Sequence, residues 1–441
     1  MENCAIVILA AGKGTRMKSE LPKVLHGFAN RPMLGHLLAA TRALRPARTV
    51  VITGFGAEAT EAYCNAHIPG CEFVRQTEQR GTGHAVQMCQ PLLGNHQGPI
   101  IMLYGDVMLT TREDVLPTLL ARQAENPLGL NLLAAKVENP QGLGRLMHQD
   151  GRLINVEEKD CTSAQRTITT ANPGIYCIHG PALWPLLAKL TPNNAQHELY
   201  LTDVIAHAAE AGLTVTMSEV KAERPEMGIN SRAELAAYDA LYQNRKRMAA
   251  MAAGATLVQP ETIYFSFDTV LEPDTTVGPF VTFGPGVSVS RNSVVLPFSH
   301  LEGCTIGRNA RIGPYARIRP STTLADGVHI GNFVEIKNAT IAEGSKANHL
   351  SYVGDADVGA NVNLGAGTIT ANYNRKTGQK NRTTVGKGSS TGSGTVLVAP
   401  VTLAEGSYTG ANTVVRKDTE AYSLTAAAVE NLHKSNYSKP E

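Results

Sequence analysis

Apolar and polar positions follow two different periods along this chain of 441 residues. Up to about residue 225, short apolar runs such as "CAIVILA", "RTVVITG", "PIIMLYGD" and "GLNLLAAKV" predict buried strands. Segments with a helical pattern, including "MLGHLLAATRAL" and "GTGHAVQMCQPLL", lie between them. Strands that alternate with helices predict an α/β domain with a mainly parallel sheet, whose ligands bind at the carboxyl ends of the strands.

The pattern changes at residues 231–253, "SRAELAAYDALYQNRKRMAAMAA", which are rich in helix formers and contain neither glycine nor proline. They predict one long helix that ends near Gly254. Beyond it, an aliphatic residue returns every six positions, as at Ile306, Ile312 and Ile318. This period predicts a parallel β-helix, in which each hexapeptide supplies a short strand and a turn.

Three parts follow from these patterns. We expect a first domain over residues 1–230, a helical linker over 231–253 and a β-helix domain over 254–441. The last segment, "AYSLTAAAVENLHKSNYSKPE", lacks the repeat and predicts a tail.

Composition narrows the class of protein. A formal net charge of +2 gives no general attraction for nucleic acid or an anionic membrane. No apolar run is long enough to span a bilayer, and the N-terminus lacks the features of a signal peptide. The seven cysteines are scattered without a C-x-x-C pair, which argues against a disulfide framework or a zinc site. We expect buried or idle thiols in a reducing cytoplasm.

Anion-binding chemistry begins where the first strand ends, in "ILAAGKGTRMKSELPKV". Gly12 and Gly14 allow the backbone to approach a phosphate, and Arg16 and Lys23 add positive charge. Asp106 ends the strand "IIMLYGD" and offers a carboxylate to a hard cation such as magnesium. A plain strand–helix turn would explain the glycines, and an N-cap would explain the aspartate. Together, however, they predict a polyphosphate site at one edge of the sheet.

Several segments resemble the motifs of the sugar-nucleotide nucleotidyltransferases. They are "LAAGKGTRMKSELPK", "QTEQRGTGHAV", "LYGDV", "NPGIY", "YLTD" and "GINSR". The likeness is to the bacterial bifunctional N-acetylglucosamine-1-phosphate uridylyltransferases/glucosamine-1-phosphate N-acetyltransferases and extends from residue 6 to about residue 415. It implies a Rossmann-like nucleotidyltransferase domain, a left-handed β-helix, a cytoplasmic homotrimer, and synthesis of UDP-N-acetylglucosamine for the cell envelope.

The resemblance also implies roles for residues of the first domain. Arg16 and Lys23 would stabilise charge on the triphosphate, and Asp106 and Asn230 would bind Mg²⁺. The residues that would hold UTP or UDP-N-acetylglucosamine are Leu9, Ala10, Ala11, Gly12, Lys23, Gln76, Gly81, Thr82, Tyr104, Gly105, Asp106, Gly144, Glu157, Asn172 and Asn230. Among them, Gln76, Gly81 and Thr82 would recognise uracil. The sugar would contact Tyr104, Gly144, Glu157 and Asn172.

In the β-helix, basic, hydroxyl and amide groups interrupt the aliphatic repeat in "YARIRPS", "NFVEIKN", "SKANHLSYVGD" and "NVNLGAGTITANYN". The same resemblance makes His349 the general base that deprotonates the amine of glucosamine 1-phosphate for attack on acetyl-CoA. The residues that would bind the sugar phosphate are Arg319, Lys337, Tyr352 and Asn363. Those that would lie at the acetyl-CoA end are Ala366, Asn372, Tyr373, Ser393 and Ala411, with Asn372 and Tyr373 also orienting the sugar.

Two departures from the family pattern concern acetyl-CoA. The stretch before the Gly-Ser motif reads "GKGSSTGSGT", without the usual aspartate and aromatic residue. The arginine that contacts the CoA phosphates in the family falls within residues 426–428, which are all alanine here. The remaining candidates for that charge are Lys417, Lys434 and Lys439.

Two alternatives to the bifunctional enzyme stay open at this point. One is a monofunctional sugar-1-phosphate nucleotidyltransferase with a non-catalytic β-helix, against which the groups around His349 speak. The other is a regulatory or assembly protein that retains both folds without chemistry. The presence of Lys23, Asp106 and Asn230 argues against it.

Overall fold

The computed structural model describes residues 3–194 and 196–428, and the chain divides into two compact units, Met1–Leu241 and Tyr242–Glu441. The boundary falls inside the long helix α8 (Arg232–Ala252), which matches the helix predicted over 231–253. Among the helices that the structure describes, none combines the length and apolar character needed to cross a bilayer.

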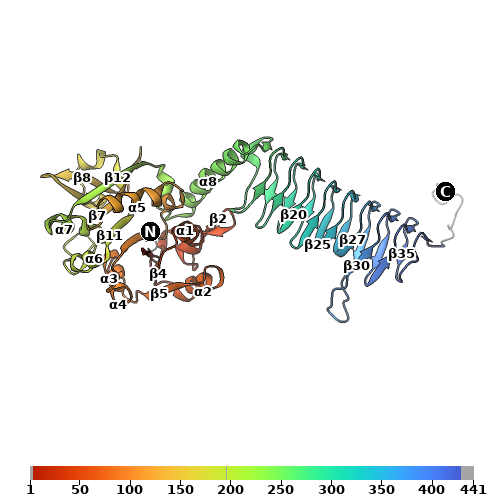
Figure 1. Cartoon of the computed structure of the whole chain (residues 1–441), viewed down its shortest axis with the longest axis horizontal. Coiled ribbons are helices and arrows are strands. Elements are labelled where there is room, and N and C mark those ends of the chain that lie inside the picture. The colour runs from red at the N-terminus through yellow and green to blue at the C-terminus, as the bar shows by residue number, and fades with distance from the viewer. Residues whose placement is uncertain (1–2, 195, 429–441) are drawn as a thin grey trace, which may run out of the picture. The chain divides into compact units, whose positions relative to one another are not determined.

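The first unit is built on one ten-stranded sheet (Figure 1). In spatial order its strands are β5 (Cys71–Arg75), β4 (Arg48–Thr53), β1 (Ala5–Leu9), β6 (Pro99–Tyr104), β11 (Tyr176–His179), β7 (Leu130–Lys136), β10 (Thr170–Asn172), β8 (Gly144–Gln149) and β9 (Arg152–Val156), with β12 (Val215–Lys221) paired to β7. Strands β5, β4, β1 and β6 are all parallel, as predicted. Beyond β6 the sheet is mixed, because β11 and β10 run antiparallel to their neighbours.

Helices cover both faces of this sheet because both faces are apolar. Along β1, Ala5 and Val7 join one buried cluster, and Ile6 and Ile8 join the other. The helices of this unit are α1 (Met33–Arg42), α2 (Ala57–His67), α3 (Thr82–Gln87), α4 (Gln90–Leu93), α5 (Val115–Glu125), α6 (Gly180–Leu187) and α7 (Val204–Glu210). Residues of α3, α6 and α7 pack into the first cluster, and those of α1, α2 and α5 pack into the second.

One predicted helix is divided in the structure. The segment "GTGHAVQMCQPLL" forms α3 and α4 instead of a single helix. Pro91 lies in the first turn of α4, where its missing N–H costs nothing but prevents an uninterrupted helix.

The second unit is a parallel β-helix whose short strands stack coil upon coil (Figure 1). One sheet contains β13 (Thr256–Leu257), β15 (Thr276–Val277), β18 (Val294–Val295), β21 (Arg311–Ile312), β24 (His329–Asn332), β26 (Lys346–His349), β28 (Asn363–Leu364), β31 (Ser390–Thr391), β34 (Tyr408–Thr409) and β36 (Leu424–Thr425). The other contains β14 (Val270–Leu271), β16 (Thr282–Phe283), β17 (Ser288–Val289), β19 (His300–Leu301), β20 (Cys304–Ile306), β22 (Arg317–Ile318), β23 (Thr322–Leu324), β25 (Glu335–Ile341), β27 (Tyr352–Val358), β29 (Ile369–Ala371), β30 (Thr383–Val385), β32 (Val396–Val398), β33 (Val401–Leu403) and β35 (Val414–Val415).

The register of the strands explains the six-residue period. Val277 pairs with Val295, and Val295 pairs with Ile312, so one coil takes 18 or 17 residues (295 − 277 and 312 − 295), about three hexapeptides. The aliphatic residues of the repeat form one buried cluster along the axis, which includes Ile306 and Ile318. Burial of these side chains is the main driving force for stacking the coils.

Two features of the β-helix were not predicted. The expected tail starts later than residue 421, because Leu424–Thr425 forms a further strand paired with β34; the rest of that segment from residue 429 lies outside the described residues. An aromatic ladder of four exposed rings runs along one corner, with neighbouring centroids 4.9–5.1 Å apart: Phe280, Phe298, Tyr315 and Phe333. All four have positive φ, which L-residues rarely adopt.

Candidate functional site

A cavity of about 360 Å³ opens in the first unit where β1 and β6 end. Leu9 and Tyr104, the last residues of these strands, are paired in the sheet, and Gly105 N–H donates to the Leu9 carbonyl at 3.0 Å. The predicted residues that line the cavity are Leu9, Ala10, Ala11, Gly12, Lys23, Gln76, Gly81, Thr82, Tyr104 and Asp106. The structure therefore brings the three motifs around residues 9, 76 and 104 to one place.

The two glycines of the first loop, Gly12 and Gly14, have different structural roles. A Cβ on Gly12 would meet no atom within 4 Å, so this position leaves room for a ligand. A Cβ on Gly14 would lie 2.7 Å from the Cβ of Lys23, and Gly14 has φ +59°. Gly14 thus serves the packing of Lys23, whereas close approach to phosphate is possible at Gly12.

Three distant residues meet at the polar side of this cavity. Lys23 Nζ donates a hydrogen bond to Asn230 Oδ1 at 3.1 Å and forms an ion pair with Asp106. The Ile229 N–H donates to the Asp106 carbonyl at 3.0 Å, which brings Asn230 to this edge from far along the chain. A carboxylate oxygen and an amide oxygen thus converge on one cationic group. Such a donor pair fits a hard divalent cation.

Arg16 lies in the 3-10 turn Thr15–Met17, and its side chain is exposed. Within the described part of the chain it makes no hydrogen bond or ion pair, so it is free to move toward an anion. The cavity also has lining residues that were not predicted, namely Val24, Gln79, Ala85 and Glu198. Gln79 could have been found, because it lies inside "QTEQRGTGHAV"; its amide donates to the Ala11 carbonyl at 3.0 Å.

The predicted sugar-binding residues gather around a residue that was missed, Asn155. Its Nδ2 donates to Glu157 at 2.8 Å, and its Oδ1 accepts from Asn172 at 3.0 Å. A Cβ on Gly144 would lie 2.6 Å from the same Oδ1. Gly144, Glu157 and Asn172 do not line the cavity described above, but Tyr104 does. Burial raises the pKa of Tyr104, and the charge of Glu157 adds to this increase. The predicted sugar-binding residues therefore adjoin the cavity.

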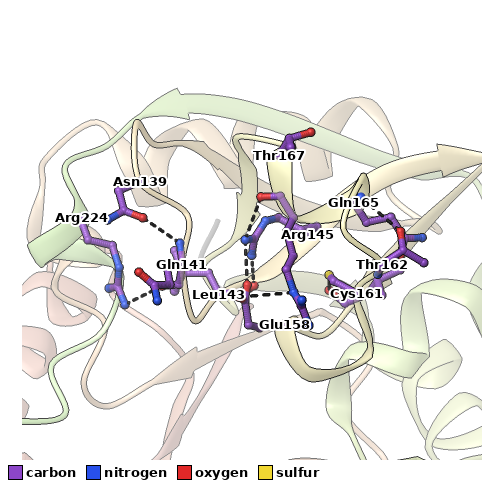
Figure 2. Close-up of polar contacts among 12 residues, drawn as sticks. Asn139, Gln141, Leu143, Arg145, Glu158, Cys161, Thr162, Gln165, Thr167 and Arg224 are labelled. Atoms are coloured by element: carbon purple, nitrogen blue, oxygen red, sulfur yellow. Dashed lines mark hydrogen bonds and ion pairs between the residues drawn. The ribbon is translucent and has the colours of Figure 1, made fainter.

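Arg145 and Glu158, which follow Gly144 and Glu157 in the chain, form an ion pair (Figure 2). The Arg145 side chain is only 1% exposed, and its Nη2 lies 2.7 Å from Glu158 Oε2. Arg145 also donates to the carbonyls of Leu143 and Arg166. Because Arg145 follows Gly144 and Glu158 follows Glu157, this pair holds the two strand ends that carry predicted sugar-binding positions.

In the second unit, the register stacks the predicted acetyl-transfer residues in one column. Ala347 pairs with Leu364, and Leu364 pairs with Thr391 on the next coil. Ser390, the residue before Thr391, pairs with Tyr408 on the coil after that. Counting two residues on from these pairs gives the column of His349, Ala366, Ser393 and Ala411. Hydrogen bonds between coils support it: Gly394 N–H donates to the Ala366 carbonyl, and Asn412 N–H to the Ser393 carbonyl, both at 2.7 Å.

His349 itself is exposed and is oriented by a residue that sequence reasoning missed. Its Nδ1 lies 3.0 Å from Asn332 Oδ1, on the neighbouring coil. Because an amide oxygen only accepts hydrogen bonds, Nδ1 carries the proton and Nε2 is left as the basic nitrogen. A cavity of about 470 Å³ next to it is lined by both residues and by Tyr315 and Phe333 of the aromatic ladder.

Three cations, Arg319, Lys337 and Lys380, gather beside the other sheet. Lys380, and then Arg319, lowers the pKa of Lys337, because like charges disfavour its protonated form. Arg319 is also paired with Glu335 at 2.7 Å. Lys380 was not predicted, since it lies on an insertion between Ala371 and Thr383 where the repeat is interrupted.

The amide and hydroxyl groups predicted to orient the sugar form a network nearby. Asn372 donates to the Tyr352 hydroxyl at 3.3 Å and also to Asp355. Asp355 in turn accepts from Asn338 at 2.5 Å. Tyr373 is exposed and shares an isolated bridge with Lys380. Asn363 lies apart from this network and donates to Ser390 at 3.4 Å.

The position of the missing arginine also lies at the end of the column. Gly410, Ala411 and the residues after β36 follow the same register, so Ala427 lies on the coil next to Ala411. Ala427 and Ala428 are exposed, and the Ala427 N–H donates to Thr413 at 3.3 Å. Lys417 is exposed too, whereas Lys434 and Lys439 lie outside the described residues.

Comparison with known proteins covers both units. Residues 6–200 match the MobA-like NTP transferase domain, and residues 303–338 match six bacterial transferase hexapeptide repeats. A "Bifunctional protein GlmU" from Jannaschia sp. (strain CCS1) is 42% identical over 432 residues, covering 98% of this chain and 94% of that protein. The protein of the same name from Acinetobacter baumannii (strain ACICU) is 40% identical, and the match covers 99% of this chain and 98% of that protein. The one from Ruegeria sp. (strain TM1040) is 44% identical, and the match covers 98% of this chain and 95% of that protein.

These relatives span almost the whole chain, so the likeness includes the nucleotidyltransferase unit, the helix and the β-helix together. Because proteins of this one name match it at 40–44% identity over nearly its whole length, the chain belongs to the GlmU family of bifunctional transferases.

Proposed function

We propose that the protein makes UDP-N-acetylglucosamine by two consecutive transfers, each in its own domain. Residues 254–441 transfer the acetyl group of acetyl-CoA to glucosamine 1-phosphate. Residues 1–230 then transfer the uridylyl group of UTP to N-acetylglucosamine 1-phosphate and release pyrophosphate, with residues 231–253 as the linker. The observation that carries this proposal is the presence of two separate polar constellations, one around Lys23 and Asp106 and one around His349.

For uridylyl transfer, the sugar phosphate oxygen attacks the α-phosphorus of UTP in line, and pyrophosphate leaves. Gln76, which lines the cavity, recognises uracil, and Tyr104, which lines it too, contacts the sugar. Lys23 and Arg16 stabilise the charge that develops on the phosphates. No covalent intermediate with the enzyme is needed.

Asp106 and Asn230 are the residues that would hold a divalent metal ion, which we take to be Mg²⁺. Both oxygens already face one cation, the Lys23 ammonium. When bound, the metal neutralises phosphate charge. In its presence Lys23 remains available to the triphosphate, since it lines the same cavity.

For acetyl transfer, His349 Nε2 accepts a proton from the 2-ammonium group of glucosamine 1-phosphate. The free amine attacks the thioester carbonyl of acetyl-CoA, and CoA leaves as the thiol. Arg319 and Lys337 bind the sugar phosphate, and Lys380 contributes a third positive charge. Asn332 keeps the imidazole in the tautomer that this reaction needs.

We also propose that the protein is a homotrimer in the cytoplasm, where UTP and acetyl-CoA are available. The aromatic ladder supports assembly, because its four rings are each about half exposed in a single chain. A neighbouring copy that covers Tyr315 and Phe333 would also close the cavity next to His349. The acetyl-transfer sites would then lie between chains.

The direct test is to incubate the protein with UTP, Mg²⁺, acetyl-CoA and glucosamine 1-phosphate. UDP-N-acetylglucosamine should form only when all four are present. A monofunctional nucleotidyltransferase would make the product from N-acetylglucosamine 1-phosphate and UTP but would release no CoA from acetyl-CoA. That second result would overturn the assignment of the β-helix.

Sedimentation equilibrium of the full chain tests the trimer, and a monomer would contradict sites shared between chains.

A further inference from the structure

The two oxygens of the Glu157 carboxylate, at the sugar end of the first site, have different surroundings. Oε1 accepts a hydrogen bond from Asn155 Nδ2 at 2.8 Å and another from Thr202 Oγ1 at 3.2 Å. Oε2 accepts none within the described part of the chain. A carboxylate offers about four lone-pair sites on its two oxygens, so the fold occupies one oxygen and leaves the other to a donor of a ligand.

Asn155 also orients Asn172, the next predicted sugar-binding residue. Its Oδ1 accepts from Asn172 Nδ2 at 3.0 Å, so one amide side chain bridges Glu157 and Asn172. The Asn172 amide is held further by Gly174 N–H, 2.9 Å from its Oδ1, and by the Tyr176 hydroxyl, 2.8 Å from its Nδ2. Tyr176 is completely buried, and burial raises the pKa of its hydroxyl well above the ordinary value. The bridge therefore ends in the core of the sheet, which holds Asn155 in one orientation.

Thr202 connects Glu157 to the wall of the nucleotide cavity. It lies in the 3-10 turn Leu201–Asp203, which packs against α3. The Leu201 N–H donates to Thr82 Oγ1 at 3.0 Å, and Thr82 lines the cavity. Glu157 Oε1 is thus held from two sides, by Asn155 on β9 and by Thr202 on this turn.

We propose that Asn155 and Thr202 are positioning residues for sugar recognition, which together hold Glu157 Oε1 and leave Oε2 to accept from a hydroxyl or N–H group of N-acetylglucosamine 1-phosphate. The inference rests on the proposed uridylyl transfer and adds two residues to it. Each of them acts through Glu157. Because the carboxylate is ordered before the sugar arrives, binding needs little further loss of side-chain freedom. Losing an anchor should therefore raise the KM for the sugar phosphate and leave the KM for UTP almost unchanged.

Several other titratable groups lie near Glu157. Burial raises the pKa of each of them, and the charge of Glu157 adds to the increase: Tyr104, Cys161, Tyr176, Tyr200 and Asp203. Asp160 acts on Asp203 in the same direction, whereas His207 opposes it. These groups are present in the parent protein and in every variant below, so the ratio of the two KM values at each pH removes their common contribution.

Asn155→Asp tests the first anchor through a pH profile. It keeps an acceptor for Asn172 but puts a second carboxylate at hydrogen-bond distance from Glu157 Oε1. Two such carboxylates share a proton at low pH and repel each other once both are ionised. The KM for N-acetylglucosamine 1-phosphate, as the ratio of variant to parent, should rise about 10-fold between about pH 6 and about pH 9, the value of one hydrogen bond to a charged group. A ratio that stays constant with pH, or an equal rise in the KM for UTP, would overturn the role of Asn155.

The second anchor is tested by a pair of substitutions. Thr202→Val removes the hydroxyl and should raise the KM for the sugar phosphate by about 2- to 10-fold, whereas Thr202→Ser keeps the donor and should stay close to the parent. Asn131→Leu is the matched control, because Asn131 donates to Gln123 at 2.6 Å in a buried amide pair that does not line the nucleotide cavity. It should lower the Tm without changing either KM. Equal effects of Thr202→Val and Thr202→Ser, or a raised sugar KM in Asn131→Leu, would refute positioning by Thr202.

The parent protein separates this inference from the function on which it rests. If the parent makes no UDP-N-acetylglucosamine from UTP and N-acetylglucosamine 1-phosphate, the proposed function fails and this inference fails with it. If the parent is active and the sugar KM of Asn155→Asp and Thr202→Val equals that of the parent at every pH, the positioning roles alone are wrong.

Discussion

Replacing Arg145 by methionine tests how the buried ion pair supports the sugar end of the first site. Removing one partner of a buried pair costs about 3–5 kcal/mol, because the other charge stays behind without compensation. In Arg145→Met the charge left behind is Glu158, whose side chain is 27% exposed and also lies 4.0 Å from Arg166, so water and Arg166 relieve part of the cost. We therefore expect about 3 kcal/mol, the lower end of that range.

The reciprocal variant should be worse. In Glu158→Gln the charge left behind is Arg145, which is only 1% exposed, so the cost should approach about 5 kcal/mol. The double variant Arg145→Met/Glu158→Gln leaves no uncompensated charge and should cost clearly less than the two single values added together. For a unit of this size, 3 kcal/mol corresponds to a decrease in Tm of about 6–12 °C.

Calorimetry of the full-length chain can measure these effects, since UTP should raise the Tm of the nucleotidyltransferase unit and so identify its transition. The KM for N-acetylglucosamine 1-phosphate should also increase in Arg145→Met, because Gly144 and Glu157 lose their support. Acetyl transfer serves as the internal control and should not change. A milder effect of Glu158→Gln than of Arg145→Met, or strictly additive effects, would refute the reasoning.

Three further predictions concern the proposed chemistry. Asp106→Ala should abolish pyrophosphate release from UTP while acetyl transfer continues, and unchanged release would remove Asp106 from the metal site. His349→Ala should lower the rate of acetyl transfer about 100- to 10,000-fold, with a smaller loss at high pH where the substrate amine is already deprotonated; an equal loss of uridylyl transfer would indicate misfolding. Without the family arginine, the KM for acetyl-CoA should be high, and Ala427→Arg should lower it by up to about 10- to 150-fold, the value of one charge-assisted hydrogen bond. If the parent already saturates at low micromolar acetyl-CoA and the arginine changes nothing, another group binds the CoA phosphates.

The architecture could be predicted from the sequence where the pattern is local. The aliphatic residue at every sixth position shows the β-helix directly, because each hexapeptide makes the same turn and buries the same position. The apolar runs of β1, β4 and β6 likewise identify the parallel part of the sheet. The antiparallel part beyond β6 could not be predicted, because pairing direction depends on which distant strands meet.

The site was predictable only in the parts that belong to a contiguous motif. Gly12, Lys23 and Asp106 lie in motifs, and the structure places all three at one cavity. Asn155 lies in no quoted motif, and Asn332 begins the segment "NFVEIKN" but has no role of its own in the pattern; each matters because folding brings it next to a predicted residue, Glu157 or His349. Contacts of this kind depend on tertiary neighbours, so they have no signal in the local sequence.

The coiled register has a consequence for how this domain tolerates insertions and deletions. Between Asn363 and Ser390 one coil takes 27 residues (390 − 363) instead of 17 or 18, yet the strands on either side stay paired in step. The additional residues leave the stack between Ala371 and Thr383 and bring Lys380 next to Lys337, which we propose binds the sugar phosphate. The number of residues between two strands can therefore change at a corner of the coil without disturbing the pairing of the strands. A single residue added inside a strand would instead shift every later position of its coil by one place, and the side chains that face inward and outward would exchange.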